Sequence, residues 1–237
     1  MSSAWVPEEE GTVTGGLSEE AYARAINALR NVEPQSRFVF GKWKRLSESD
    51  IKKIAILRVC SPQTRIANLR SLEYSPDMDK LLENETHEEE RFVILRKHGI
   101  RFPDQKTERI SHILSLNILG LIQSLEQLSG TSLSQERRAR ERVMTVINGM
   151  GLKTASDFLK DIGFSKYLAV LDSRNLRFLQ DIGLTPKQLK AGELTKRKIY
   201  YKLEDIENEL AKKMGITVSE LDEKIMAYTE EEKPHRI

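Results

Sequence analysis

Two glycines with a single residue between them, Gly149 and Gly151, separate two stretches of the chain that have helical periodicity. Glycine adopts positive φ values without a steric penalty, so this spacing allows a tight reversal between two helices. The first stretch follows a Ser N-cap at Ser132, and the second begins near Lys153. The pattern predicts a helix–hairpin–helix unit. The amides of such a turn and the start of its second helix face outward and suit a phosphate group.

The rest of the chain is also mostly helical in its periodicity. Apolar residues recur at helical spacing in several stretches; Ser18 and Ser132 are candidate N-caps, and Gly130, Gly149 and the Ser61-Pro62 pair mark helix ends. We expect helices over 18–32, 47–60, 108–130, 132–149, 202–215 and 219–231. A capping box at Thr86 and Glu89 predicts a further helix that ends near Gly99. An extended segment is expected only near Phe38–Trp43, and the fold class is therefore all-α.

Composition excludes several other classes. A chain of 237 residues, 39% hydrophobic and 31% charged, can bury a core as one large domain or two small lobes. One cysteine, Cys60, excludes an intrachain disulfide and an all-cysteine zinc or iron–sulfur site. The four histidines are scattered, so no metal site is expected. The absence of a long apolar stretch and of a secretory signal predicts a soluble intracellular protein without a membrane segment.

The charges are unevenly distributed along the chain. Residues 134–203 hold 15 Lys and Arg against 7 Asp and Glu, whereas residues 204–237 hold 5 against 10. A basic region in a chain of net charge +2 indicates a local footprint for an anion, with nucleic acid as the first candidate. A set of solvated helix faces would give the same counts, so charge alone leaves both interpretations open.

Lys153 and Asp172 are the candidate chemical groups. Lys153 lies in the first turn of the second predicted helix, where a deprotonated amine could act as a nucleophile. Asp172 follows it by nineteen residues, at the end of an apolar run and directly before another helix. Its carboxylate either caps that helix or projects into a cleft. A solvent-exposed lysine in a DNA-binding hairpin without chemistry is the alternative for Lys153.

These residues resemble the motif of the helix-hairpin-helix DNA glycosylase superfamily. That motif has an apolar residue, x-Gly-apolar-Gly-x-Lys-x-Ala and then an Asp after two apolar residues. It corresponds here to 147–155 followed by Val170-Leu171-Asp172. The amino-acid sequence of residues 153–179, and that of the segments 58–70 and 210–228, is similar to the sequences of the archaeal-type (type 2) 8-oxoguanine DNA glycosylase/AP lyases. The resemblance covers about residues 50–230.

The resemblance implies a two-lobed fold and a specific reaction. One helical barrel lobe would span 46–164 and end in the hairpin, and the second would combine 1–45 with 165–237. The active-site cleft between them would hold Lys153 and Asp172. Lys153 would displace a damaged purine, 8-oxoguanine first, through a Schiff base followed by β-elimination. Asp172 would assist the lysine and stabilise the charge that develops on the sugar.

The resemblance also implies a set of DNA contacts. The amides of Gly149 and Gly151 would hold a backbone phosphate, and Gln63 would fill the hole that a flipped base leaves. Met226 and Tyr228 would line the base pocket. Basic residues near the hairpin would add phosphate contacts; these are Arg137, Arg138, Arg140, Arg142, Lys196, Arg197 and Lys198.

The implied partner is double-stranded DNA with a flipped damaged base, bound by a monomer. No cofactor is implied other than a monovalent cation at the hairpin carbonyls, and the implied location is the cytoplasm, at the nucleoid, or the nucleus.

The sequence departs from the family pattern at three places. Ser173-Arg174-Asn175 follows the Asp where relatives have Arg-His or Thr-His. Met226 stands near the position where relatives have an aromatic residue, commonly Trp. The chain also continues to Ile237, and Lys233 is the only lysine in this tail. Two alternatives therefore stay open, namely an AP lyase or glycosylase for another lesion and a non-catalytic helix-hairpin-helix DNA-binding protein. Asp172 favours an enzyme, because a binding hairpin has no need of that carboxylate.

Overall fold

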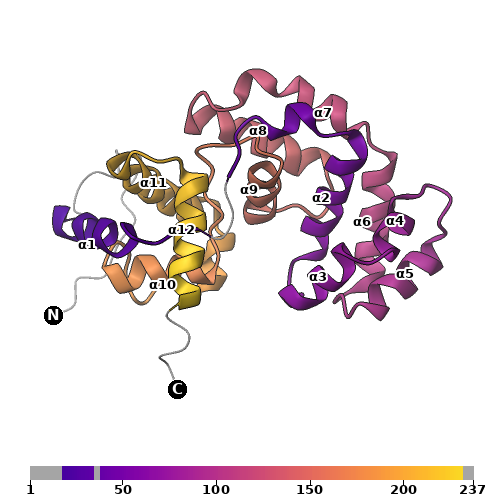
Figure 1. Ribbon diagram of the computed structural model, residues 1–237, viewed down its shortest axis with the longest axis horizontal. Helices are drawn as coiled ribbons and strands as arrows, with labels where there is room; N and C mark the ends of the chain where they lie inside the picture. The colour runs from indigo at the N-terminus through magenta and orange to yellow at the C-terminus, as the bar shows by residue number, and fades with distance from the viewer. Residues whose placement is uncertain (1–17, 35–37, 232–237) are drawn as a thin grey trace.

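The computed structural model describes residues 18–34 and 38–231, and this part of the chain contains helices and no strand. The helices form two groups joined at the top of an arch (Figure 1). The all-α prediction is confirmed. The parts of the predicted second lobe that fall in 1–17, 35–37 and 232–237 lie outside the described residues.

The first lobe packs around a hydrophobic cluster that runs from Trp43 to Leu168. Its helices are η1 (Lys42–Arg45), α2 (Glu48–Cys60), α3 (Ile66–Glu73), α4 (Asp77–Leu82), α5 (Glu88–Lys97), α6 (Pro103–Ser115), α7 (Ile118–Ser124), η2 (Glu126–Leu128), α8 (Leu133–Val146) and α9 (Leu152–Asp161). α2 lies at the centre, and its buried face includes Ile51 and Ile56, both fully shielded from solvent.

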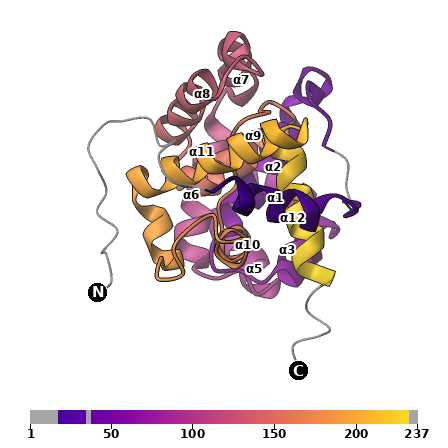
Figure 2. The same ribbon diagram turned by 90° about the vertical axis from the view of Figure 1, so that its left-hand side faces the viewer.

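The second lobe has a separate cluster, to which residues 21–32 and 169–227 contribute. Its helices are α1 (Glu19–Leu29), α10 (Ser173–Ile182), η3 (Ala191–Thr195), α11 (Arg197–Met214) and α12 (Val218–Glu231). Figure 2 shows α11 crossing this lobe with α1, α10 and α12 beside it. The N-terminal helix and the C-terminal helices therefore share one core although they are far apart in sequence.

The extended segment expected near Phe38–Trp43 is wrong for the residues that the structure describes, since a turn leads into η1 there. Gly41 has φ +80 and its N–H donates to Gly163 O at 2.7 Å. This reversal places Trp43 in the first core, where its ring lies 5.7 Å from that of Phe164. Aromatic residues at alternating positions mimic a strand, but here the glycine ends the extended path.

The single long helix expected over 108–130 is divided into α6, α7 and η2. Asn117 causes the first break, because its side chain caps α7 by accepting from Gly120 N at 2.9 Å. The Thr86–Glu89 capping box is also wrong. His87 is the N-cap of α5, and the Thr86 hydroxyl donates to Lys80 O instead.

The two predicted Ser N-caps are confirmed, since Ser18 and Ser132 accept from the backbone N–H groups of Ala21 and Gln135. Ser47 is a third Ser N-cap and accepts from Asp50 N. Among the described residues, no helix is both long and apolar enough to cross a membrane.

A buried ion pair joins the two lobes. Arg140 of α8 and Glu204 of α11 are both shielded completely from solvent, and Arg140 Nη1 lies 2.6 Å from Glu204 Oε1. Arg140 also donates to Ser156 Oγ of α9 at 2.9 Å, and Arg137 donates to Glu204 Oε2 at 2.7 Å. The two helices of the hairpin are thereby fixed to the longest helix of the second lobe.

We expect Glu204→Gln to lower the free energy of unfolding by about 3–5 kcal/mol, because it leaves a buried guanidinium without its counter-charge. Chemical denaturation measures this loss. The matched control is Glu126→Gln, which removes an exposed pair with Lys44 and should cost less than about 1 kcal/mol. Equal losses for the two variants would contradict a special role for the buried pair.

Candidate active site

The reversal between α8 and α9 has the predicted hairpin form. α8 ends at Val146, Gly149 adopts φ +86, and Gly151 is the extended N-cap of α9 with φ −94. No side chain caps α9, so its first N–H groups keep free hydrogen-bonding capacity. His112 Nε2 lies 2.8 Å from Val146 O and supports the start of the turn.

Gly149 cannot be replaced without strain. Besides the positive φ, a Cβ atom there would lie 2.4 Å from Cδ of Arg109 on α6. At Gly151 a Cβ atom would meet nothing within 4 Å. The first glycine is therefore required by the backbone and by packing, whereas the second leaves open space at the start of α9.

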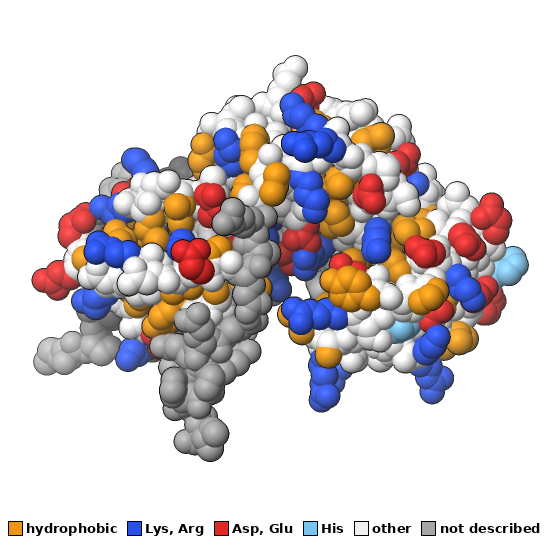
Figure 3. Space-filling view, in the orientation of Figure 1, with side chains coloured by type: hydrophobic (Ala, Val, Ile, Leu, Met, Phe, Trp, Pro, Cys, Tyr) orange, Lys and Arg blue, Asp and Glu red, His pale blue; other side chains and the backbone are white. Residues whose placement is uncertain are grey.

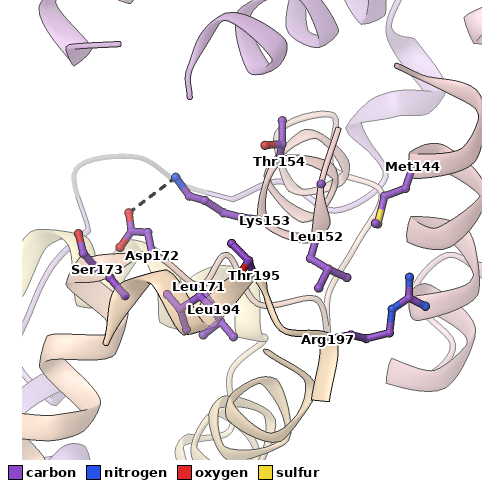
Figure 4. A pocket seen from close by; sticks show the side chains of 12 residues that line it. Met144, Leu152, Lys153, Thr154, Leu171, Asp172, Ser173, Leu194, Thr195 and Arg197 are labelled. Atoms are coloured by element: carbon purple, nitrogen blue, oxygen red, sulfur yellow. Dashed lines mark ion pairs between the residues drawn. The ribbon is translucent and has the colours of Figure 1, made fainter. Parts of the chain in front are cut away.

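Lys153 and Asp172 face each other at the place where α9 and α10 begin. Lys153 Nζ lies 3.9 Å from Asp172 Oδ2, and their side chains are 44% and 15% exposed. Figure 4 shows Lys153 extending from α9 towards Asp172. The structure thus brings together the two residues that the sequence singled out as the candidate chemical groups.

Asp172 is also the N-cap of α10. Its Oδ1 accepts from the backbone N–H groups of Arg174 and Asn175 at 2.7 and 3.2 Å. Burial acts to raise the pKa of Asp172, but the hydrogen bond and charge of Arg174, together with the charge of Lys153, outweigh it and the net pKa is lowered. The carboxyl group is therefore ionised at neutral pH.

A pocket of about 460 Å³ adjoins this pair (Figure 4). Its lining residues come from the starts of α9, α10 and α11, from η3 and from α8; they are Met144, Gly151, Leu152, Lys153, Thr154, Leu171, Asp172, Ser173, Ala191, Leu194, Thr195 and Arg197. Apolar side chains form much of the wall, and the charged groups Lys153, Asp172 and Arg197 stand around it.

A buried polar cluster holds in place the start of α10, where Asp172 is the N-cap. Asn175 Nδ2 donates to Glu207 Oε1 of α11 at 3.3 Å and to Asp222 Oδ1 of α12 at 3.2 Å. Burial, with the nearby charge of Asp222, raises the pKa of Glu207 well above its usual range. Lys160 of α9 in turn binds Asp222 and lies 2.9 Å from Glu223. The start of α10 is therefore connected to three other helices.

Gln63 lies in the exposed turn between α2 and α3 and has φ +59. Phe102, the residue before α6, is 51% exposed and has φ +55. These two are the non-glycine residues with positive φ in the described part of the chain. Buried Lys106 joins their turns, because Nζ donates to Pro62 O at 3.1 Å and Lys106 N donates to Phe102 O. Strained, exposed backbone of this kind gathers at functional sites.

The basic residues near the hairpin divide into two sets. Arg138, Arg142, Lys196 and Lys198 are exposed. The prediction that Arg140 contacts phosphate is wrong, because its side chain is fully buried against Glu204. Arg137 is also engaged within the protein, where it binds Glu204 and Asp205 and stacks on Tyr201. Arg197 lines the pocket and pairs with Glu141 at 2.8 Å.

The structure does not bring Met226 and Tyr228 to the pocket that contains Lys153. Both lie on α12 and are partly buried. The Tyr228 ring packs edge-on against Phe178 at 5.6 Å, within the core of the second lobe. The resemblance implied that these two residues line the base pocket, but Tyr228 packs against that core. Among the described residues, no group of three or more His, Cys, Asp or Glu could hold a metal ion.

The sequence did not predict a role for two residues beside Asp172. Arg174 and Asn175 stand out in the sequence only as departures from the family pattern, yet each donates a hydrogen bond to Asp172. Their place two and three residues after a predicted helix N-cap is the signal that could have identified them, since the N–H groups of those positions bind the cap.

A family model for the 8-oxoguanine DNA glycosylase matches residues 37–216. The chain is 36% identical over 135 residues to an 8-oxoguanine DNA glycosylase/AP lyase of Aquifex aeolicus, covering 56% of this chain and 57% of that protein. It is 26% identical over 172 residues to that of Sulfolobus acidocaldarius, covering 72% and 77%. The matches span 57% of the length of the Aquifex aeolicus protein and 58% of that of an 8-oxoguanine DNA glycosylase/AP lyase of Sulfurisphaera tokodaii.

Solved structures show the same fold. An 8-oxoguanine glycosylase/lyase of Methanocaldococcus jannaschii, in complex with a 15mer DNA containing 8-oxoguanine, superposes with a TM-score of 0.65 at 22% identity and covers 90% of each chain. The 8-oxoguanine DNA glycosylase of Thermotoga maritima superposes with a TM-score of 0.61 at 21% identity, covering 87% of this chain and 86% of that one. The two-lobed helix-hairpin-helix glycosylase fold is therefore confirmed.

We expect Gly149→Ala to lower the free energy of unfolding by about 1–2 kcal/mol or more, from the left-handed backbone alone, with the close approach to Arg109 adding to it. Gly151→Ala is the control. It has an ordinary φ and open space, so its cost is limited to the poorer N-cap that alanine provides and should stay below about 1 kcal/mol. Chemical denaturation of both variants tests this, and a Gly149→Ala protein as stable as the Gly151→Ala protein would contradict it.

Proposed function

The chain belongs to the 8-oxoguanine DNA glycosylase family, and from this membership we propose that it is a bifunctional DNA glycosylase/AP lyase that excises 8-oxoguanine from double-stranded DNA. The Lys153–Asp172 pair, formed where α9 and α10 begin, carries the proposal. It supplies an amine and a carboxylate beside a pocket and next to a turn that suits a DNA phosphate.

In the first step the neutral amine of Lys153 attacks C1′ of the flipped nucleotide. A bond forms between Nζ and C1′, the bond from C1′ to the base breaks, and the base leaves with the electron pair and takes up a proton. The amine loses a proton as the sugar ring opens, and a Schiff base results. A water molecule then takes a proton from C2′, a C2′=C3′ double bond forms as the C3′–O bond breaks and expels the 3′ phosphate, and a second water hydrolyses the imine to release the lysine.

Asp172 stabilises the positive charge that develops on the sugar during the first step. Its lowered pKa keeps it ionised, as an electrostatic role requires. The two backbone N–H groups at Oδ1 fix its orientation without protein rearrangement at the moment of reaction. The burial of the carboxylate strengthens the effect, because a partly buried charge is less screened by water.

DNA would bind across the hollow face between the lobes (Figure 3), where acidic and basic side chains both gather. The hairpin amides would hold one phosphate, and the exposed residues Arg138 and Lys198 add sequence-independent contacts. Gln63 and Phe102 project from adjacent exposed turns and would occupy the space of the flipped base. Extrusion of a base costs a few kcal/mol, which such side chains offset in part.

We also propose that the enzyme acts as a monomer, at the nucleoid or in the nucleus, without a metal cofactor in the chemical steps. The amine and the carboxylate account for both bond cleavages. A monovalent cation at the hairpin carbonyls stays a prediction, and none of the steps above depends on it.

Borohydride trapping tests the activity. We expect the wild-type protein to form a covalent adduct with a duplex containing 8-oxoguanine and with one containing an abasic site. Lys153→Gln should form neither adduct while it still binds DNA, because the glutamine amide cannot form an imine. Undamaged and uracil-containing duplexes are the substrate controls.

An adduct on the abasic duplex alone would keep the lyase and move the substrate to another lesion. No adduct on any duplex, with binding intact, would place the protein among the non-catalytic helix-hairpin-helix proteins. An undiminished adduct with Lys153→Gln would remove Lys153 from the mechanism.

Asp172→Asn separates the two roles of that residue. Asparagine is as good an N-cap as aspartate, so we expect the free energy of unfolding to fall by no more than about 1 kcal/mol, from loss of the ion pair with Arg174, whereas loss of the charge should slow single-turnover excision by about 100-fold or more. Excision rates and denaturation midpoints measured on the same preparation give both readouts. A wild-type rate would show that Asp172 serves the helix alone.

A further inference from the structure

All the lone pairs of the Asp172 carboxylate have hydrogen-bond partners other than Lys153. Oδ1 accepts from the backbone N–H groups of Arg174 and Asn175. Oδ2 accepts from Nε and Nη2 of Arg174 at 3.0 and 2.8 Å. An ionised carboxylate offers about four acceptor sites, and these four hydrogen bonds use them.

Lys153 is excluded from direct hydrogen bonding by this arrangement. Its Nζ lies 3.9 Å from Oδ2, an ion-pair distance that is longer than a hydrogen bond. Oδ2 is the oxygen that faces the lysine, and the guanidinium of Arg174 occupies it. Asp172 can therefore orient Lys153 or accept its proton only after Arg174 gives up at least one of its two side-chain hydrogen bonds.

Arg174 is placed to bind the substrate. It lies in the first turn of α10, and its side chain is 36% exposed, whereas that of Asp172 is 15% exposed. The guanidinium group matches the geometry of a phosphate as well as that of a carboxylate, and it binds both bidentately. A DNA strand that delivers C1′ to Lys153 brings its flanking phosphates to this same edge of the pocket.

We propose that Arg174 exchanges partners when substrate binds: its guanidinium leaves Asp172 Oδ2 for a DNA phosphate beside the flipped nucleotide, and Oδ2 then accepts a hydrogen bond from Lys153. This inference rests on the proposed function. It makes Arg174 a residue that couples correct placement of the DNA backbone to completion of the Lys153–Asp172 pair. The backbone hydrogen bonds at Oδ1 do not change, so the carboxylate keeps its orientation throughout.

The exchange also accounts for the state without DNA. In that state the guanidinium pairs with the partly buried carboxylate and hydrogen-bonds Oδ2, an oxygen that Lys153 at 3.9 Å would leave without a direct hydrogen bond. An unpartnered oxygen on a partly buried charge is costly, so Arg174 stabilises the free protein. A phosphate offers equivalent hydrogen bonds to the arginine, and the lysine offers one to the aspartate, so the exchange leaves neither charge unpaired.

The test compares Arg174→Gln and Arg174→Lys with Arg177→Gln. Arg177 is exposed on the same helix, so its variant loses the same charge at a site away from Asp172. One measurement is equilibrium binding to a duplex with a tetrahydrofuran abasic analogue, which cannot form an imine, over a range of salt concentrations. The other is single-turnover cleavage of a natural abasic duplex at saturating enzyme.

We expect Arg174→Gln to weaken binding about tenfold and to reduce the slope of log affinity against log salt by about 0.9, the value for one phosphate contact. Its saturated single-turnover rate should equal or exceed that of the wild type, because Oδ2 is then available to Lys153 from the start. Arg174→Lys should keep the salt slope and bind less tightly than the wild type. Arg177→Gln should match the wild type in saturated rate.

Two results would overturn the proposal. Unchanged affinity and salt slope in Arg174→Gln would show that Arg174 does not reach a phosphate. A saturated rate well below that of Arg177→Gln would show that Arg174 must stay on Asp172 during the reaction. Failure of the proposed function looks different, because the wild-type protein would then cleave no abasic duplex, whereas the salt dependence of binding would still report on Arg174.

Discussion

The position of the candidate active site depends on the buried carboxylate of Glu204. Its two oxygens bind Arg140 and Arg137 of α8, and Oε1 also accepts from Ala169 N at 3.1 Å. Ala169 belongs to the segment that leads directly to Asp172, while α8 leads into the hairpin that presents Lys153. One side chain of α11 thus fixes both the segment that leads to Asp172 and the helix that leads into the hairpin with Lys153. A buried charge is tolerated only when it is fully hydrogen-bonded, and this requirement makes the arrangement sensitive to small displacements of either lobe.

The segment between α9 and α10 is held along its length in the same way. Glu136 accepts from the N–H groups of Lys166 and Tyr167, and burial raises its pKa against the effect of these hydrogen bonds. The Tyr200 hydroxyl lies 2.8 Å from Ala169 O and 3.3 Å from Leu171 N. An irregular segment that crosses a protein interior must satisfy its backbone polar groups by such side chains. The result is that Asp172 stands at the end of a rigid connection, and rigid support is what a catalytic pair at a fixed distance requires.

Local signals predicted the hairpin, the Ser caps and the Lys153–Asp172 pair, because glycine spacing, N-caps and helix starts depend on residues that are neighbours in the sequence. The errors concern properties that only tertiary packing decides. Arg140 and Arg137 were expected at the DNA because their charge is visible in the sequence, but the acidic partner that binds both within the protein lies on a helix more than sixty residues later. The break between α6 and α7 needed the Asn117 cap to win over a continuous apolar pattern. The left-handed backbone of Gln63 and Phe102 has no sequence signal comparable to a glycine.

The two interpretations of Asp172 that the sequence left open, a helix cap and a carboxylate that projects into a cleft, are both confirmed in geometry because they use different oxygens. Oδ1 belongs to the scaffold, since it binds only backbone N–H groups of α10. Oδ2 faces the pocket and is shared between two side-chain cations, with Arg174 nearer than Lys153. The helix therefore fixes where the carboxylate lies, and the competition between the cations decides what it can do. A cap whose second oxygen binds only side-chain cations can change its chemical role without any movement of the backbone.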